Sequence, residues 1–159
     1  TTIATLPNTI STTNAAFCCK FNSSGTYQYS RLVDSGNSEI GYSVACDSSG
    51  NMYFAGQYTN ASIYAVNSSN VVTTIGTLPS TVFAGVFCCK FDSSGTYQYS
   101  RIVDTINSDN GYSVACDSSG NMYLAGQYNG TSASVYAVNS SNVSTVVATL
   151  PNPISNDGA

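Results

Sequence analysis

An internal repeat constrains this chain more than any other feature. The segment FCCKFNSSGTYQYSR at residues 17–31 returns as FCCKFDSSGTYQYSR at residues 87–101, with Asn22 replaced by Asp92. A period of this length is typical of repeat architectures, in which one unit buries too little surface alone and relies on its neighbours. The sequence therefore predicts two copies of one structural unit.

Further matches place the limits of the units. GYSVACDSSGNMY begins at residue 41 and again at residue 111, which is the same offset of 70. YAVNSSNV begins at residues 64 and 136, an offset of 72, because a loop that reads TNAS in the first unit reads NGTSAS in the second, which is two residues longer. ATLPN occurs near both ends of the sequence. These offsets predict a first β unit at 1–76, a second at 77–148, and the start of a third unit or an interlocking tail at 149–159.

Each unit is expected to be all-β. The first contains six short runs rich in β-branched and aromatic residues, namely FCCKF, TYQYSRLVD, YSVACD, MYFAGQY, SIYAVN and VVTTIGTL. The turn-forming segments NSSG, DSSGN and NSSN separate them and predict three hairpins per unit, with no helix longer than a turn. Several runs are apolar on both faces, as expected when sheets pack face to face. A sandwich and a propeller both fit this pattern.

The run AFCCKFNSSGTYQYSRLVD followed by GYSVACDSSGNMYFAGQY resembles the SBBP repeat, a family named for the seven-bladed β-propeller. The resemblance covers residues 16–58 and 86–128, and it implies four-stranded blades in extracellular or surface proteins without known chemistry. The third hairpin and the cysteines depart from the family pattern, and two units are fewer than the roughly 4–8 blades of a closed propeller. We therefore expect propeller-blade-like sheets of tandem antiparallel hairpins that stack openly or are completed by neighbouring copies.

Charge is scarce. Charged residues make up 8% of the chain, the net charge is −4, and the four basic residues are Lys20, Arg31, Lys90 and Arg101. So few cations cannot neutralise a phosphate backbone, so nucleic acid is not an expected partner. No run of about 18 apolar residues occurs, so membrane insertion is not expected either. No basic-then-apolar leader opens the sequence, and any export signal is expected to lie outside it or to have been removed.

Glycans could keep a surface so poor in charge hydrated, and without them it would tend to associate. Six Asn-X-Ser/Thr sequons lie in segments that read as turns or strand ends. They predict a secreted, glycosylated chain that is extracellular or on a cell surface. The six candidate glycosylation sites are Asn22, Asn60, Asn67, Asn129, Asn139 and Asn142.

Each unit carries three cysteines. They lack Cys-x-x-Cys spacing and an accompanying His, so no metal site is expected, and disulfides are the natural use in a secreted chain. Neighbours on a strand point to opposite faces, so we expect one of Cys18 and Cys19 to bridge to Cys46 and the other to seek a different unit or chain. The alternative is that some are small buried apolar side chains. The six are Cys18, Cys19, Cys46, Cys88, Cys89 and Cys116.

No catalytic or cofactor-binding residues are predicted. The chain contains no His to act as a base for a Ser nucleophile. DSSGN lacks the distal Glu of a calcium loop and reads as a hairpin turn in which Gly50 and Gly120 take positive φ. The twelve tyrosines suit either carbohydrate binding or the filling of space between sheets.

Two functions follow from these patterns. The first is a structural, self-assembling extracellular glycoprotein, a head-to-tail homopolymer that forms a fibre or surface layer through its equivalent terminal segments, residues 1–15 and 145–159. The alternative is a propeller-like adhesin or lectin module that binds glycans or a cell surface. Its binding residues would lie in the most divergent loops, at 35–40 and 105–110.

Overall fold

The computed structural model describes residues 13–81 and 83–151. These residues form twelve strands, all paired antiparallel, and no helix, which confirms the all-β fold of repeated hairpins; none of them could therefore cross a membrane as a helix. The first unit contains β1 (Ala16–Phe21), β2 (Tyr27–Asp34), β3 (Ile40–Cys46), β4 (Met52–Tyr58), β5 (Ser62–Val66) and β6 (Val72–Thr77). The second contains β7 (Gly85–Phe91), β8 (Tyr97–Asp104), β9 (Asn110–Cys116), β10 (Met122–Gln127), β11 (Ala133–Asn139) and β12 (Ser144–Leu150).

All three expected hairpins form in each unit, and their turns explain why the sequence folds this way locally. In the β3–β4 turn, the Asp47 carboxylate accepts the backbone N–H groups of Ser49 and Asn51, both at 3.0 Å. Gly50 closes the turn at φ 77° and its equivalent Gly120 at φ 78°, as predicted. An Asx side chain that bonds its own backbone, followed by a glycine in the left-handed region, stabilises a tight reversal.

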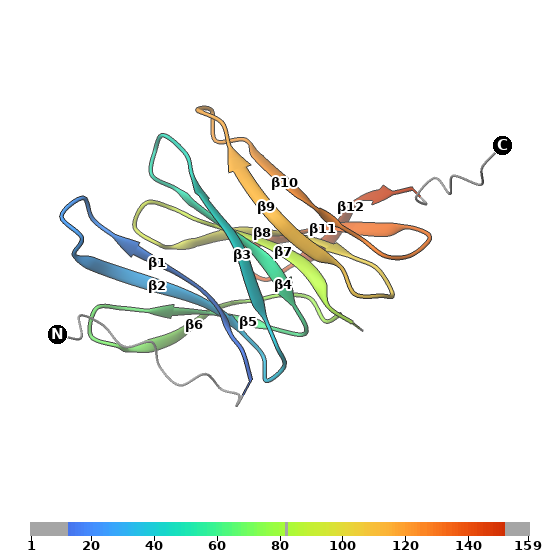
Figure 1. Ribbon diagram of the computed structural model, residues 1–159, viewed down its shortest axis with the longest axis horizontal. Helices are drawn as coiled ribbons and strands as arrows, with labels where there is room; N and C mark the ends of the chain where they lie inside the picture. Colours follow the sequence, from blue (N-terminus) through green and yellow to red (C-terminus); the bar gives the residue numbers. More distant parts are fainter. Residues whose placement is uncertain (1–12, 82, 152–159) are drawn as a thin grey trace.

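The hydrogen-bonded sheets are offset from the sequence units. Strands β1, β2, β5 and β6 of the first unit form one sheet in the order β1-β2-β5-β6. The β3–β4 hairpin leaves that sheet and pairs through β4 with β7 of the second unit, giving a six-stranded sheet in the order β12-β11-β8-β7-β4-β3. The β9–β10 hairpin forms a separate two-stranded sheet (Figure 1). Each unit thus builds a four-stranded sheet and sends its middle hairpin elsewhere.

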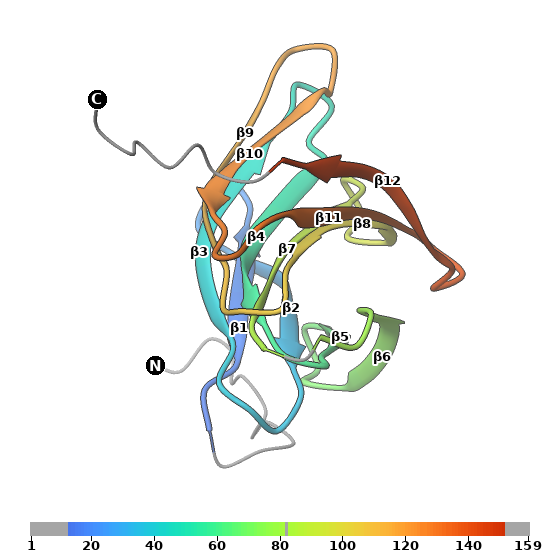
Figure 2. The ribbon, with the colours of Figure 1, turned by 90° about the vertical axis from the view of Figure 1, so that its right-hand side faces the viewer.

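The sheets stack face to face. Strand β9 lies against β3 and β4, and β1 lies near β3. In Figure 1, strand β1, the β3–β4 hairpin and the β9–β10 hairpin therefore follow one another as successive layers. Contacts between layers join equivalent residues: the Ser48 hydroxyl donates to the Ser118 carbonyl at 3.0 Å, and the Tyr42 and Tyr112 rings meet edge to face at 5.7 Å. Figure 2 shows that β5–β6 and β11–β12 extend to the same side of the stack.

Stacking buries both faces of the central strands. Cys89 belongs to the larger hydrophobic cluster, whereas its neighbour Cys88 belongs to a second cluster with Tyr53, Ala55 and Val114. The expectation that adjacent cysteines point to opposite faces is therefore confirmed.

Candidate self-assembly interface

Strand β4 of the first unit and β7 of the second meet in one continuous antiparallel ladder. The register runs from Met52 opposite Phe91 to Tyr58 opposite Gly85. We call the surface formed by this ladder and by the contacts around it the internal junction. It is the place where one unit of this chain binds the next.

Phe87 is the central apolar contact of the internal junction. Its ring is fully buried and meets the rings of Phe54 and Tyr58 edge to face, at centroid distances of 5.2 and 6.2 Å. Gly56 makes room for it, because a Cβ there would lie 2.8 Å from the Phe87 ring and 2.0 Å from the Ile40 carbonyl oxygen. Burying a phenylalanine side chain is worth roughly 1.5–3 kcal/mol, so this contact is a major attachment between the units.

Arg31 is the main polar contact of the internal junction. Its Nε and Nη2 donate to the Gly95 carbonyl oxygen at 2.8 and 2.6 Å, and its guanidinium lies 4.2 Å from the centroid of the Tyr29 ring. Gly95 has φ 86°, and a Cβ there would lie 2.2 Å from Nη2. The close approach of this turn to the first unit therefore requires glycine.

Lysines at matching positions border the same junction. Lys20 donates to the Ser93 carbonyl of the second unit at 2.6 Å. The Lys90 ammonium lies 5.1 Å from the centroid of the buried Tyr53 ring. Cation–π contacts of this kind add modestly to stability and keep the charge partly exposed.

The same residue types are exposed where no second unit covers them. Phe17 and Phe21 on β1 are the equivalents of Phe87 and Phe91, yet they are 55% and 50% exposed. On β10, Tyr123 is 59% exposed, whereas its equivalent Tyr53 is fully buried. Strand β1 therefore exposes the residue types that β7 contributes to the internal junction, and β10 exposes those that β4 contributes.

A cavity of about 310 Å³ lies beside β10. Five of its eight lining residues are equivalents of residues that share the larger hydrophobic cluster with Phe87. Tyr128 donates its hydroxyl proton to the Pro151 carbonyl, as Tyr58 does to Pro79. The walls of the Phe87 site are thus rebuilt in the second unit. The lining residues are Val86, Val103, Leu124, Ala125, Gly126, Gln127, Tyr128 and Leu150.

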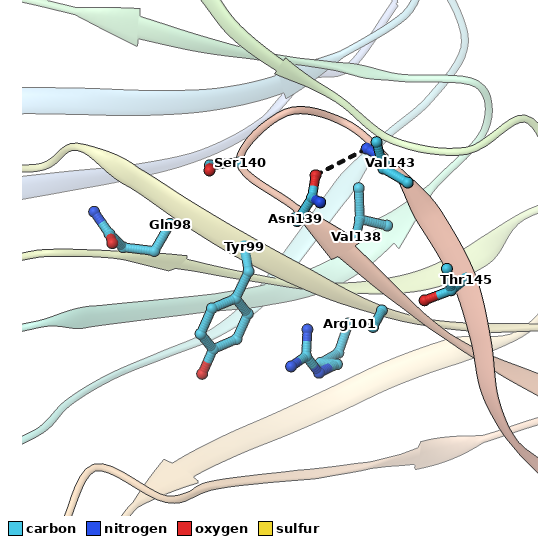
Figure 3. Close-up of a pocket in the computed structure, with 9 residues that line it drawn as sticks. Gln98, Tyr99, Arg101, Val138, Asn139, Ser140, Val143 and Thr145 are labelled. Atoms are coloured by element: carbon cyan, nitrogen blue, oxygen red, sulfur yellow. Dashed lines mark hydrogen bonds between the residues drawn. The ribbon is translucent and has the colours of Figure 1, made fainter.

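A second cavity, of about 340 Å³, lies over β8 and the β11–β12 turn. Figure 3 shows Arg101 and Tyr99 side by side on its wall. The Arg101 guanidinium lies 4.4 Å from the centroid of the Tyr99 ring and donates to the Ser100 carbonyl at 3.0 Å. Arg31 stacks on Tyr29 and donates to the Ser30 carbonyl in the same way, so Arg101 has the pose that holds Gly95 at the internal junction.

All six predicted disulfide cysteines are free thiols in the structure. Cys18, Cys88 and Cys89 are buried, and burial raises the pKa of each thiol, in the case of Cys89 to about 12. Cys46 is exposed. The alternative interpretation, small buried apolar side chains, describes the three buried thiols, and the disulfide pairing remains a prediction.

All six predicted glycosylation asparagines are exposed and lie at turns or strand ends. Several of them organise the backbone with their side-chain oxygen: Asn22 accepts Thr26 N–H at 2.8 Å, and Asn142 in the β11–β12 turn accepts the N–H of Thr77 at the end of β6 at 2.9 Å. Such bonds use the oxygen and not the amide nitrogen that would carry a glycan. Asn129 differs, because its side-chain nitrogen donates to the Ser108 carbonyl at 2.8 Å. Glycosylation itself remains a prediction.

The divergent loops at 35–40 and 105–110 contain a feature that the sequence comparison missed. Glu39 and Asp109 occupy equivalent positions and are both buried. Glu39 accepts a hydrogen bond from the Ser35 hydroxyl at 2.6 Å, and Asp109 accepts one from the Thr105 hydroxyl at 3.1 Å. Burial raises the pKa of Glu39. Both carboxylates hold their own loop together, and Asp109 also accepts the backbone N–H of Asn129 at 2.9 Å. An acid four residues after a hydroxyl residue was the available signal, but a comparison of residue identities does not detect it.

No constellation typical of catalysis or metal binding occurs among the described residues. No group of three or more acidic or Cys side chains gathers there as metal ligands would. Asp104 has an unusual environment, since burial and the nearby Asp109 carboxylate raise its pKa to about 6. The Asp109 carboxylate itself accepts hydrogen bonds from Thr105 and from the Asn129 backbone N–H.

The terminal segments predicted to make the head-to-tail contact lie largely outside the described residues, which include only 13–15 and 145–151 of them. Comparisons with protein-family models, with curated proteins and with solved structures found no match. The internal junction and its exposed equivalents are therefore the basis for a functional conclusion.

Proposed function

We propose that this chain is a structural, extracellular glycoprotein whose β repeats self-assemble head to tail into a fibre or surface layer. The observation that carries the proposal is the strand exchange at the internal junction, where a hairpin of one unit completes the sheet of the next. In a stack of such units, each end carries an unpaired strand whose equivalent inside the stack is paired with the next unit.

The chemistry of the chain supports a structural role. Two contacts between units join the same residue types at equivalent positions, namely the Tyr42–Tyr112 and Ser48–Ser118 pairs. Charge repulsion between copies is low because few residues are charged. The exposed sequons place candidate glycans at turns, away from the central ladders. The partners proposed for this role are further copies of the chain and covalent glycans.

Electron microscopy and sedimentation of the native, unreduced protein over a range of concentrations would test this role. We expect regular filaments or sheets whose axial repeat is commensurate with one or two units, and a sedimentation coefficient that rises with concentration. A monodisperse monomer at high concentration would contradict the proposal. Enzymatic removal of glycans before the measurement is the control for association that is mediated by carbohydrate alone.

A further inference from the structure

We propose that strand β10 of one copy pairs antiparallel with strand β1 of a second copy, in the register of the internal junction. This inference rests on the proposed function and names the surface through which assembly occurs. It places the contact at Ala16–Phe21 and Met122–Gln127 and not in the terminal segments suggested by the sequence.

The pattern of unpaired edges singles out these two strands. In the described residues, β3 and its equivalent β9 are both edge strands, as are β6 and its equivalent β12. Those edges stay unpaired even where two units meet. Among the strands of residues 13–81 and 83–151, only β1 and β10 are edge strands whose equivalents, β7 and β4, are paired with each other. An unpaired strand edge is a template for another chain, and here the chain itself contains the complementary edge.

The internal register fixes the register between copies. Because Ala55 lies opposite Cys88 and Gly56 opposite Phe87, Ala125 would lie opposite Cys18 of the second copy, and Gly126 opposite its Phe17. The exposed Phe17 ring would then enter the cavity of about 310 Å³ beside β10. A cavity of about 150 Å³ already accepts a benzene ring, so this one is large enough for a phenylalanine side chain.

A polar contact is available at the same time. Arg101 is posed like Arg31, and its equivalent acceptor would be the Gly25 carbonyl of the second copy. Gly25 has φ 78°, like Gly95, and a Cβ there would meet nothing within 4 Å, so the turn is accessible. Asp92 remains partly exposed at the internal junction. Its equivalent Asn22 therefore keeps a solvent-facing side for a glycan.

A third contact agrees with the first two. In the register of the internal junction, Lys20 of the second copy lies opposite Tyr123, as Lys90 lies opposite Tyr53. This pairing would cover the exposed Tyr123 ring and place an ammonium group over it. Different surfaces of each copy meet in this contact, so it is heterologous and continues from copy to copy.

Two substitutions in the full chain separate the two halves of the contact. Phe17→Ser removes the ring from the β1 edge, and Ala125→Lys places a charge on the β10 edge. Both side chains are exposed in the single chain, so folding should be retained and is checked by circular dichroism and thermal unfolding. The matched control is Val146→Lys on the β12 edge. Its equivalent in the first unit, Thr74, stays exposed although the second unit is joined to the first, so this position is not expected to take part in a contact between units.

Sedimentation velocity of the three variants, and of mixtures, gives the result. We expect Phe17→Ser and Ala125→Lys each to weaken association at least about tenfold, and Val146→Lys to associate like the original chain. An equimolar mixture of Phe17→Ser and Ala125→Lys should form dimers and nothing larger, because only the β10 edge of the former and the β1 edge of the latter remain intact.

Three other results would overturn the inference, and they can be distinguished from one another. If the original chain assembles and both edge variants assemble equally well, the β1–β10 contact is wrong while self-assembly stands. If the original chain is monomeric at every concentration, the proposed function fails and the contact fails with it. Mixtures that restore long polymers would also contradict the contact, because they would show that neither substitution blocks growth.

Discussion

The two units of this chain carry nearly the same sequence, but several equivalent residues differ sharply in exposure. Val44 on β3 is 54% exposed, whereas Val114 on β9 is 5% exposed, because β9 packs against β3 and β4 of the first unit. Phe17 and Phe87 differ in the same way. In a repeat protein, the burial of a residue is therefore decided by what stacks on its unit, and the contribution of that residue to stability should depend on its position in the stack.

The largest expected difference concerns the phenylalanine pair. Phe87→Ala should lower the free energy of unfolding by about 3–5 kcal/mol, since it removes a fully buried ring and leaves a cavity. Phe17→Ala, at the exposed equivalent, should change it by less than about 0.5 kcal/mol. Urea unfolding at low protein concentration, where association is negligible, measures both. Equal effects of the two substitutions would mean that the units do not differ as described.

A smaller difference is expected for the arginine pair. Arg31→Met keeps an unbranched apolar side chain but removes the two donors to the Gly95 carbonyl, and should cost about 2 kcal/mol because a buried acceptor loses a charged partner. Arg101→Met should cost about 0.5 kcal/mol or less in the single chain. Thermal unfolding of the two variants side by side measures the difference. A cost for Arg101→Met as large as for Arg31→Met would show that the Gly95 contact is unimportant.

The smallest expected effect is a pH dependence within the second unit. The pKa of Asp104 is about 6, above its ordinary value of about 3.9, so the folded state holds this proton more tightly than the unfolded state. This group stabilises the folded state fully below about pH 4, and its contribution to the free energy of unfolding is lost as the pH rises through about 6. The loss is about 1 kcal/mol, because solvent screens the half-buried carboxyl.

Asp104→Asn should therefore flatten the decline between about pH 4 and 6, as measured by urea midpoints in a series of buffers. Part of the decline should remain, because burial also raises the pKa of Glu39. The control is Asp117→Asn. Hydrogen bonds from Asn121, together with that from Tyr123, lower the pKa of Asp117, so this substitution should leave the decline unchanged. An Asp104→Asn variant with the original pH profile would contradict the assigned environment.

Local structure was predictable from the sequence to a large extent. The six runs per unit became strands, and the separators NSSG, DSSGN and NSSN became hairpin turns, because turn chemistry and side-chain alternation act over a few residues. The positive φ of Gly50 and Gly120 followed from the same local rule. The loop structure around Glu39 and Asp109 was less accessible, since a buried carboxylate there depends on which hydroxyl faces it.

The candidate interface was only partly predictable. Equivalence between the start and the end of the sequence suggested a head-to-tail contact through the terminal segments, whereas the contact that we propose lies at β1 and β10. The pairing of β4 with β7 could not be derived from local patterns, because nothing in a strand's sequence specifies which distant edge it joins. The role of Arg31 was hidden for the same reason, as its acceptor Gly95 lies 64 residues away.

The sequence by itself determined the all-β repeat, the positions of its hairpins and the chemical equivalence of its two units, because propensities and turn signals are local properties. Only the tertiary structure decided which sheet each hairpin completes, and hence which of two chemically equivalent residues is buried. Burial and strand pairing depend on neighbours that are distant in the chain, and identical segments such as those around Phe17 and Phe87 acquire different roles when only one has such a neighbour.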